Sequence, residues 1–315
     1  MKQAIFIIAV GVFFSSCSKK NTVPNKDELL TEEKTTIPSL NKTQNGYKFQ
    51  EFDVLAEWGD NTSAYGNNNL GTIVGNYVTR NGEVHGFIFD NGQFTDVFLP
   101  EADKDSRGGL YDINDEAMSV GSFNYPKRVD HDQVGHSFKR SSDGITTVLP
   151  DAAPGALLTE ANGINNSGTT VGFYHDANSA RHGFILNNGV YTTYDKPGAV
   201  RTLLTGINNQ GKIVGFYRGI DLVAHGFTLF NGITEDINFP GSIETKLHGI
   251  NKTGQIVGEY LDEAGVTHGF LFENGKYTKL DFPGSFDTAL LGINDDGMIV
   301  GSYNGFSRGL IAMPN

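Results

Sequence analysis

The amino-acid sequence predicts an all-β protein, a six-bladed β-propeller of four-stranded blades that is closed by an N-terminal strand completing the last blade. Three observations lead to this prediction. A phrase of Gly-Ile-Asn, a short polar turn and Val-Gly occurs in six copies. Each copy belongs to a repeat with four short strand patterns, which is the content of one propeller blade. The stretch before the first copy resembles the one strand that the last repeat lacks.

The repeated phrase sets the length of the repeat. Four clear copies read GINNSGTTVGFY, GINNQGKIVGFY, GINKTGQIVGEY and GINDDGMIVGSY, and each begins 43 residues after the one before. Two weaker copies, GNNNLGTIVGNY and DINDEAMSVGSF, precede them. The six copies begin at Gly66, Asp112, Gly163, Gly206, Gly249 and Gly292. We number the repeats from one to six in this order.

The repeat that spans 245–284 shows the strand pattern most clearly. Its first strand, TKLHGIN, leads into a tight turn at Asn251 to Gly254, where Asn and Gly tolerate positive φ. QIVGEY is the second strand and, after a loop of 7 residues, HGFLF is the third. An Asn-Gly hairpin turn precedes the fourth strand, KYTKLDF, in which apolar and polar residues alternate. Pro283 ends this strand, because proline has no N–H to donate to a sheet.

The glycine of each Val-Gly pair lies inside the second strand. A glycine there costs stability unless another group packs close to the backbone. The sequence therefore predicts that neighbouring repeats touch at these glycines. They are Gly75, Gly121, Gly172, Gly215, Gly258 and Gly301.

The two ends of the repeat region indicate a closed ring. The sixth repeat stops after its third strand, at RGLIAMPN, and YKFQEFDV from Tyr47 resembles the fourth strand KYTKLDF. If this N-terminal strand completes the last blade, the ring closes without a free strand edge. A β-solenoid or an array of sandwiches is the alternative, but a solenoid needs capping repeats, and none is visible in the sequence.

Composition limits the classes of function. The chain has 315 residues with 11% aromatic and 19% charged residues, which is typical of a folded protein. The formal net charge is −12. A surface of that charge argues against binding nucleic acid or an anionic lipid surface.

The first residues predict export and lipid anchoring. Lys2 and the apolar run from Ala4 to Phe14 fit a signal peptide and are too short to span a bilayer. The stretch FSSC resembles a bacterial lipobox, which implies a signal peptide at 1–16 and a diacylated Cys17. Cys17 is the only cysteine, so it has no partner for an intrachain disulfide. An ordinary secretory signal followed by an idle thiol is the alternative.

The region after the signal peptide divides into two parts. The segment 17–45 contains the lipidated cysteine and a flexible tether of mixed charge, which as a coil spans about 30 Å. The segment 46–315 contains the six-repeat propeller. We therefore expect a monomer that is held in the cell envelope, outside the cytoplasm, on a bacterial membrane.

The repeats resemble the HAF-type extracellular repeat, named for a His-Ala-Phe motif that reads His-Gly-Phe in most copies here. The resemblance covers about 66–311 and is carried by His182-Gly-Phe, Gly206-Ile-Asn and Ile256-Val-Gly. It implies an exported repeat protein and supplies no catalytic residue or ligand. Ser137 in repeat two and Arg308-Gly-Leu in repeat six depart from the motif.

Repeated polar residues are expected to have structural roles. Histidines open five of the third strands, where their side chains are too far apart to converge on one metal ion. We expect each to hydrogen-bond a loop of its own repeat, and each Asn of Gly-Ile-Asn to cap its own turn. Trp58, the only tryptophan, is interpreted as a packing residue, with a sugar-stacking platform as the alternative. The histidines are His85, His136, His182, His225 and His268.

The candidate binding site is a loop-rich face over repeats one and two, where the 43-residue spacing fails. Loops that interrupt a rigid repeat are common places for a site. Asp130-His131-Asp132, with Asp103 and Asp105, could form a metal or polar-ligand site, but a solvated acidic loop is the favoured interpretation because no spacing matches a metal motif. Equivalent loops of later repeats add to the polar rim. The candidate ligand-binding residues are Asp103, Asp105, Arg107, Lys127, Arg128, Asp130, His131, Asp132, His175, Asp176, Arg218, Asp221, Asp262 and Glu263.

Two functions are compatible with these features. No catalytic motif is present, and we expect no catalytic residue, metal or cofactor. The favoured prediction is a membrane-tethered binding module that presents the loop-rich face to a protein or glycan. The alternative is a hydrolase or lyase that acts on a carbohydrate or ester at the propeller axis. An enzyme should have a central pocket with two or more convergent carboxylates or a bound metal.

Overall fold

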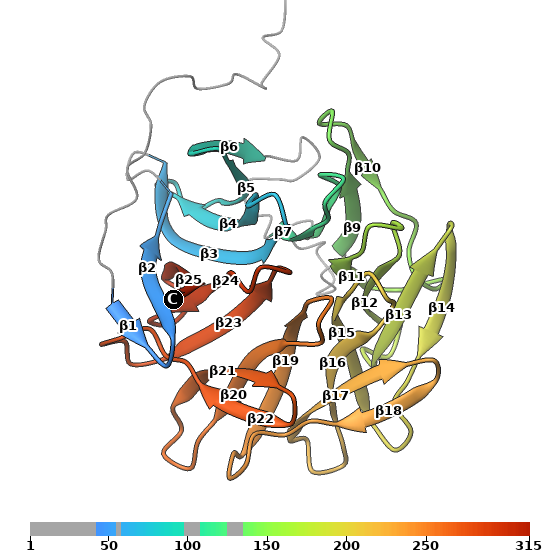
Figure 1. Ribbon diagram of the computed structural model, residues 1–315. Helices are drawn as coiled ribbons and strands as arrows, with labels where there is room; N and C mark the ends of the chain where they lie inside the picture. The colour runs from blue at the N-terminus through green and yellow to red at the C-terminus, as the bar shows by residue number, and fades with distance from the viewer. Residues whose placement is uncertain (1–41, 55–57, 98–107, 125–134) are drawn as a thin grey trace, which may run out of the picture. The chain divides into compact units, whose positions relative to one another are not determined.

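The computed structural model describes residues 42–54, 58–97, 108–124 and 135–315. All regular secondary structure in these residues is β, in 25 strands (Figure 1). In the part of the chain described, no helix is both long enough and apolar enough to cross a membrane.

Each repeat contributes antiparallel strands in chain order, as the sequence pattern predicts. The first strands are β3 (Gly59–Asn67), β7 (Gly108–Ile113), β11 (Leu158–Ile164), β15 (Arg201–Ile207), β19 (Glu244–Ile250) and β23 (Thr288–Ile293). The second strands are β4 (Ile73–Thr79), β8 (Ser119–Asn124), β12 (Thr170–His175), β16 (Ile213–Arg218), β20 (Ile256–Leu261) and β24 (Ile299–Tyr303).

The third and fourth strands follow in the same order. The third strands are β5 (Val84–Asp90), β9 (Gly135–Arg140), β13 (Arg181–Asn187), β17 (Ala224–Phe230), β21 (Thr267–Glu273) and β25 (Arg308–Pro314). The fourth strands are β6 (Gln93–Val97), β10 (Thr146–Val148), β14 (Val190–Tyr194), β18 (Ile233–Asp236) and β22 (Lys276–Lys279). Two further strands, β1 (Lys42–Gln44) and β2 (Tyr47–Phe52), precede the first repeat.

The strands form four sheets. Repeats one and five each give a separate four-stranded sheet, β3 to β6 and β19 to β22. Repeats two, three and four join in one 12-stranded sheet, because single parallel pairs link Leu158 with Gly135 and Arg181 with Arg201. The fourth sheet contains β23, β24 and β25 with β2 and β1.

The two ends of the repeat region pair with each other. Strand β2 lies antiparallel to β25, with Tyr47 opposite Pro314 and Phe52 opposite Gly309. The outer strand β1 then pairs with β2 (Figure 1). The sixth repeat therefore obtains its fourth strand from the stretch that the sequence identified as resembling it.

The asparagine of each Gly-Ile-Asn phrase links neighbouring repeats. The side-chain oxygen of Asn208 accepts hydrogen bonds from the backbone N–H groups of Gln210 and Lys212, so it caps its own turn as predicted. Its amide also donates to the backbone oxygen of Asn251 in the next repeat, at 3.1 Å, which the sequence did not predict. The same bond joins every repeat to the next, and the sixth to the first. The donors are Asn68, Asn114, Asn165, Asn208, Asn251 and Asn294.

The prediction that neighbouring repeats touch at the Val-Gly glycines is wrong. A Cβ on Gly215 would lie 2.2 Å from the backbone oxygen of Leu203, and one on Gly172 would lie 1.9 Å from that of Glu160. Both oxygens belong to the first strand of the same repeat. The close approach is therefore internal to each repeat.

Neighbouring repeats instead touch at the glycine that begins the phrase. A Cβ on Gly163 would lie 3.0 Å from the Cα of Gly206, and one on Gly206 would lie 2.5 Å from the backbone oxygen of His248. Glycine is required at these positions because the first strands of consecutive repeats approach closely there.

The apolar core lies between consecutive repeats. Val171 of repeat three packs in one cluster with Leu204 and Phe227 of repeat four. Val214 of repeat four packs in the same way with Leu247 and Phe270 of repeat five. The phenylalanine of each His-Gly-Phe motif is fully buried, so this motif supplies a large apolar side chain to the interface.

Candidate functional site

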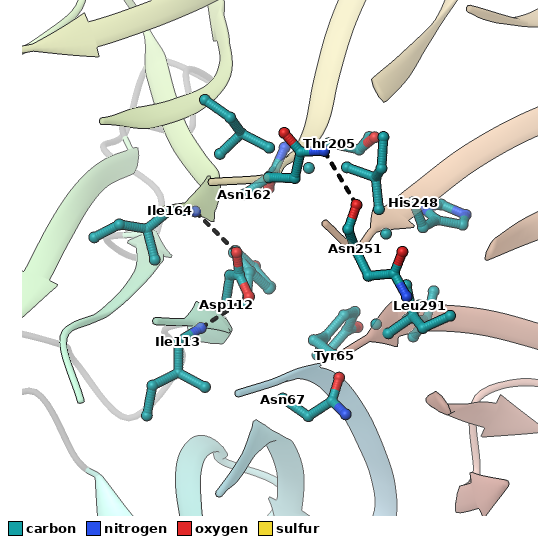
Figure 2. Close-up of a pocket in the computed structure, with 18 of the residues that line it drawn as sticks. Tyr65, Asn67, Asp112, Ile113, Asn162, Ile164, Thr205, His248, Asn251 and Leu291 are labelled. Atoms are coloured by element: carbon teal, nitrogen blue, oxygen red, sulfur yellow. Dashed lines mark hydrogen bonds between the residues drawn. The ribbon is translucent and has the colours of Figure 1, made fainter. Parts of the chain in front are cut away.

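A cavity of about 430 Å³ lies where the first strands of all six repeats meet (Figure 2). A β-bulge in each first strand, directly before the repeated phrase, leaves one residue out of the strand register. Bulges re-aim side chains, and they are frequent next to functional sites. All six bulge residues line the cavity. They are Tyr65, Tyr111, Asn162, Thr205, His248 and Leu291.

The lining has an aromatic part. The rings of Tyr65 and Tyr111, from repeats one and two, meet edge to face with centroids 5.2 Å apart. Leu291 and Phe306 of repeat six also line the cavity. Aromatic rings of this kind give a flat apolar surface with a polar edge.

Repeats three to five supply charged and amide groups. Glu160, Asn162 and Lys246 line the cavity, as do His248 and Glu259. Their strands are β11, β19 and β20. Carboxyl and amide groups of the other repeats line the cavity too, among them Asn67, Asp112 and Asp295.

Glu259 is held as an anion by Lys246 and His248. Its Oε1 lies 2.6 Å from the Nζ of Lys246, and its Oε2 lies 3.8 Å from the Nε2 of His248. Burial by itself would raise the pKa of Glu259, but His248 and Lys246 together lower this pKa to about 2. The side chain of Glu259 is only 9% exposed, so the ion pair is largely removed from solvent.

Glu160 is a carboxyl group without a hydrogen-bond partner among the described residues. Its neighbours on β11, Thr159 and Ala161, are buried in the core, whereas Glu160 faces the cavity. Burial raises the pKa of Glu160 to about 7, and the charge of Arg181 offsets only part of this effect. Glu160 can therefore gain or lose a proton near neutral pH.

Asp112 replaces the glycine that begins the phrase in the other repeats. Its two carboxylate oxygens accept the backbone N–H groups of Ile113, at 2.9 Å, and of Ile164, at 2.8 Å. Figure 2 shows the carboxylate between these two groups. Burial raises the pKa of Asp112 to about 7, although both hydrogen bonds lower it. Both oxygens are thus already engaged by the protein.

Eight of the sequence-predicted site residues lie outside the described residues. They are Asp103, Asp105, Arg107, Lys127, Arg128, Asp130, His131 and Asp132. The lipid-attachment residue Cys17 lies outside as well. The loop-rich face over repeats one and two therefore stays a prediction.

The described candidates lie at the loops after the second strands. Asp176, Asp221 and Asp262 each accept backbone N–H groups of their own loop. Arg218 forms an ion pair with Glu244, with NH1 2.6 Å from Oε1. Glu263 lies in the same loop as Asp262.

His175 lies at the end of β12, and its Nε2 is buried without a hydrogen-bond partner. Burial, Arg181 and Arg201 lower the pKa of His175 to about 4, so its imidazole is neutral at neutral pH.

Each repeated histidine contacts an aspartate of its own repeat. The aspartate lies in a loop, as predicted, except for Asp96, which lies on β6. His85 lies 2.8 Å from Asp96, and His268 lies 2.9 Å from Asp281. His136 and His182 contact Asp151 and Asp195 in the same way. His225 instead lies 3.4 Å from Asp221, in the loop before its strand. The described residues contain no group of three or more His, Cys, Asp or Glu side chains that could hold a metal ion.

Trp58 packs against other side chains, as the packing interpretation predicts. Its ring lies 5.8 Å from that of Tyr77 and 6.0 Å from that of Phe94, measured between centroids.

The cavity residues were not predicted from the sequence, although a signal was present. The residue directly before the phrase differs in chemistry between copies, from tyrosine to asparagine, threonine, histidine and leucine. Its neighbours along the chain repeat closely. A position that varies inside an otherwise regular motif has no shared packing role, so it was open to a functional interpretation.

Comparisons with known proteins identify only the fold. No family model and no curated protein sequence matches the chain. Solved structures do match. One is a catalytically inactive virginiamycin B lyase from Staphylococcus aureus with quinupristin, at 12% identity and a TM-score of 0.51, covering 85% of this chain and 99% of that one.

Two other matches have comparable scores. A gluconolactonase from Xanthomonas campestris is 11% identical with a TM-score of 0.52, and the match covers 85% of this chain and 90% of that one. The SapL1 lectin in complex with alpha methyl fucoside is 10% identical with a TM-score of 0.50, covering 78% and 88%. The chain therefore has the all-β fold of the β-propellers.

Proposed function

We propose that this protein binds a saccharide in the cavity between its first strands. The observation that supports this proposal is the composition of the cavity lining. Tyr65 and Tyr111 offer rings for stacking, and Asn162, Lys246 and His248 offer hydrogen-bond donors on other strands. A cavity of about 430 Å³ falls within the usual range for small-molecule sites.

The proposal of a saccharide follows from the combination of aromatic rings and hydrogen-bonding groups in the lining. A sugar ring has apolar C–H faces and a rim of hydroxyl groups, so it fits a site with aromatic rings and a surrounding set of donors and acceptors. The solved structures that match this fold include a lectin with a fucoside and a lactonase, which is compatible with such a ligand.

A glycan array with the full chain tests the proposal. We expect the wild type to bind a subset of glycans and Asn162→Trp to lose them, because the indole would fill the cavity from a bulge position. Val190→Trp is the matched control, since Val190 is 65% exposed on β14. Equal binding by the wild type and Asn162→Trp, or no binding by the wild type, would refute the proposal.

A hydrolase or lyase at the same cavity is the second candidate, and Glu160 favours it. A carboxyl group with a pKa of about 7 suits general acid or base catalysis at neutral pH. Five carboxyl residues line the cavity, but Asp112, Asp115 and Asp295 accept hydrogen bonds and Glu259 pairs with Lys246. Only Glu160 is free for chemistry, so binding is the better-supported function. Release of product from an array-identified glycan would instead favour the enzyme.

The finer architecture that we propose is a closed propeller of six four-stranded blades. Two observations support it. The asparagine amides bond in a cycle that runs through all six repeats and returns to Asn68. Strand β2 also supplies a fourth strand beside β25.

We further propose that the propeller is exported and tethered by lipid on Cys17, within a chain that resembles HAF-type repeat proteins. The lipobox FSSC supports this placement. Cys17→Ala is expected to move the protein from the membrane fraction to the soluble fraction of the cell envelope. Persistent membrane association of this variant would contradict lipid anchoring.

A further inference from the structure

Three arginines occupy adjacent positions on β13, β15 and β16, and other residues of β15 and β16 line the cavity. Arg181 on β13 pairs in register with Arg201 on β15, and Arg201 pairs with Arg218 on β16. His175 on β12 is the register partner of Arg181. Register partners project from the same face of a sheet on strands about 4.8 Å apart, so these four side chains form one row of three arginines and a histidine.

The row extends to the cavity lining. The guanidinium of Arg181 lies over the ring of Phe173, 5.8 Å from its centroid, and Phe173 lines the cavity. Arg201 precedes Leu203 by two residues on β15, so both project from the same face of that strand. Leu203 lines the cavity as well.

Two of these arginines have no anionic partner within the described residues. Arg218 is paired with Glu244, but neither Arg181 nor Arg201 has a hydrogen bond or a carboxylate within ion-pair distance. Arg181 is half-buried, and its pKa is lowered by burial and by Arg201 and Arg218. Placing like charges together is unfavourable, and in a chain of net charge −12 many carboxylates could have neutralised them.

A third unsatisfied group completes the row. The Nε2 of His175 is buried without a partner, and this imidazole is neutral at neutral pH, so it can donate one hydrogen bond. Two arginines and a neutral histidine thus present donors to the same space. An arginine guanidinium binds a planar carboxylate through two parallel hydrogen bonds.

We propose that Arg181, Arg201 and His175 form a subsite for the carboxylate of an acidic saccharide, whose sugar ring occupies the cavity. This inference rests on the proposed saccharide function and defines its substrate class as uronate-containing glycans. Arg218 contributes positive potential but is held by Glu244.

Calorimetric titration of the full chain with matched disaccharides tests the subsite. The probes are glucose- and galactose-based disaccharides in neutral, uronate and sulfated forms. We expect the uronate member to bind more tightly than its neutral counterpart, with an advantage that falls as salt rises. Arg181→Gln and Arg201→Gln should each weaken uronate binding by roughly 10- to 100-fold and leave neutral binding nearly unchanged.

Lys48→Gln is the control, because it removes the same charge from an exposed position on β2. Equal affinity for neutral and uronate probes, or an equal effect of Lys48→Gln, would overturn the subsite while the saccharide function stands. A preference for the sulfated member would overturn the carboxylate assignment. Failure of every disaccharide to bind would overturn both the subsite and the proposed function.

Discussion

At the scale of the residue, single substitutions within the repeat determine which charged groups line the cavity. Asp112 stands where five repeats have glycine, and its carboxylate joins repeat two to Ile164 of repeat three. Lys246 and Glu160 occupy the same strand position in different repeats, with opposite charge. The framework positions around them repeat, so these substitutions alter the cavity without altering the fold.

Asp112 predicts a pH dependence of stability. Its pKa is raised from its ordinary value to about 7 in the folded protein, so the folded state holds the proton more tightly than the unfolded state. The stabilising contribution is complete below pH 4 and is lost as the pH rises towards 7. At about 1.4 kcal/mol per pKa unit, the loss is on the order of 4 kcal/mol at most.

Urea unfolding of the wild type and Asp112→Asn at pH 4 and pH 8 measures this effect. The wild type should lose stability relative to the variant as the pH rises. The substitution itself adds only a pH-independent change in the free energy of unfolding. Asp60→Asn, on an exposed position of β3, should follow the wild type. A stability difference between wild type and Asp112→Asn that stays constant with pH would contradict the assignment.

At the scale of the element, the tight turn between the first and second strands has two tasks. The asparagine oxygen caps the turn, and its amide reaches the next repeat. The residues one position further along make a second set of contacts. Asn166 donates its backbone N–H to the side-chain oxygen of Asn209, and Asp295 donates to that of Asn69.

Asn208→Asp removes the hydrogen bond between repeats and keeps the cap of the turn. The aspartate keeps the oxygen that caps the turn but replaces the donating amide by an oxygen facing the backbone oxygen of Asn251. We expect a loss of roughly 1–3 kcal/mol in the free energy of unfolding, because a buried hydrogen bond is lost and two oxygens then face each other. The backbone oxygen of Asn251 keeps only the N–H of Gly254. Asn209→Asp is the matched control, since Asn209 uses only its oxygen. Equal stability of the two variants in urea unfolding would refute the role of the Asn208 amide.

At the scale of the whole molecule, the sequence predicted what local patterns encode. The strand order, the turn caps, the contacts of the histidines within their own repeats and the pairing of Tyr47–Phe52 with the C-terminal strand follow from motifs and their spacing. The contacts between repeats could not be predicted from the motifs. The close approach at Gly163 and the direction of the bulge residue Asn162 depend on how first strands meet, which no single repeat reveals.

The cavity differs from the site predicted from the sequence for the same reason. The sequence drew attention to irregular loops over repeats one and two, because length changes are visible in an alignment of the copies. The cavity is built from positions of constant spacing and changing chemistry, such as Tyr65 and His248. Only the bulge in each first strand shows that these residues face one space.

The position of a bound saccharide tests the central claim most directly. A crystal structure of the full chain with a glycan identified on the array should place the sugar in the cavity. We expect its apolar face against Tyr65 or Tyr111 and its hydroxyl groups within hydrogen-bond distance of Asn162, Lys246 or His248. A sugar bound instead on the loops at 101–111 and 123–135, with the cavity free of ligand, would contradict the account.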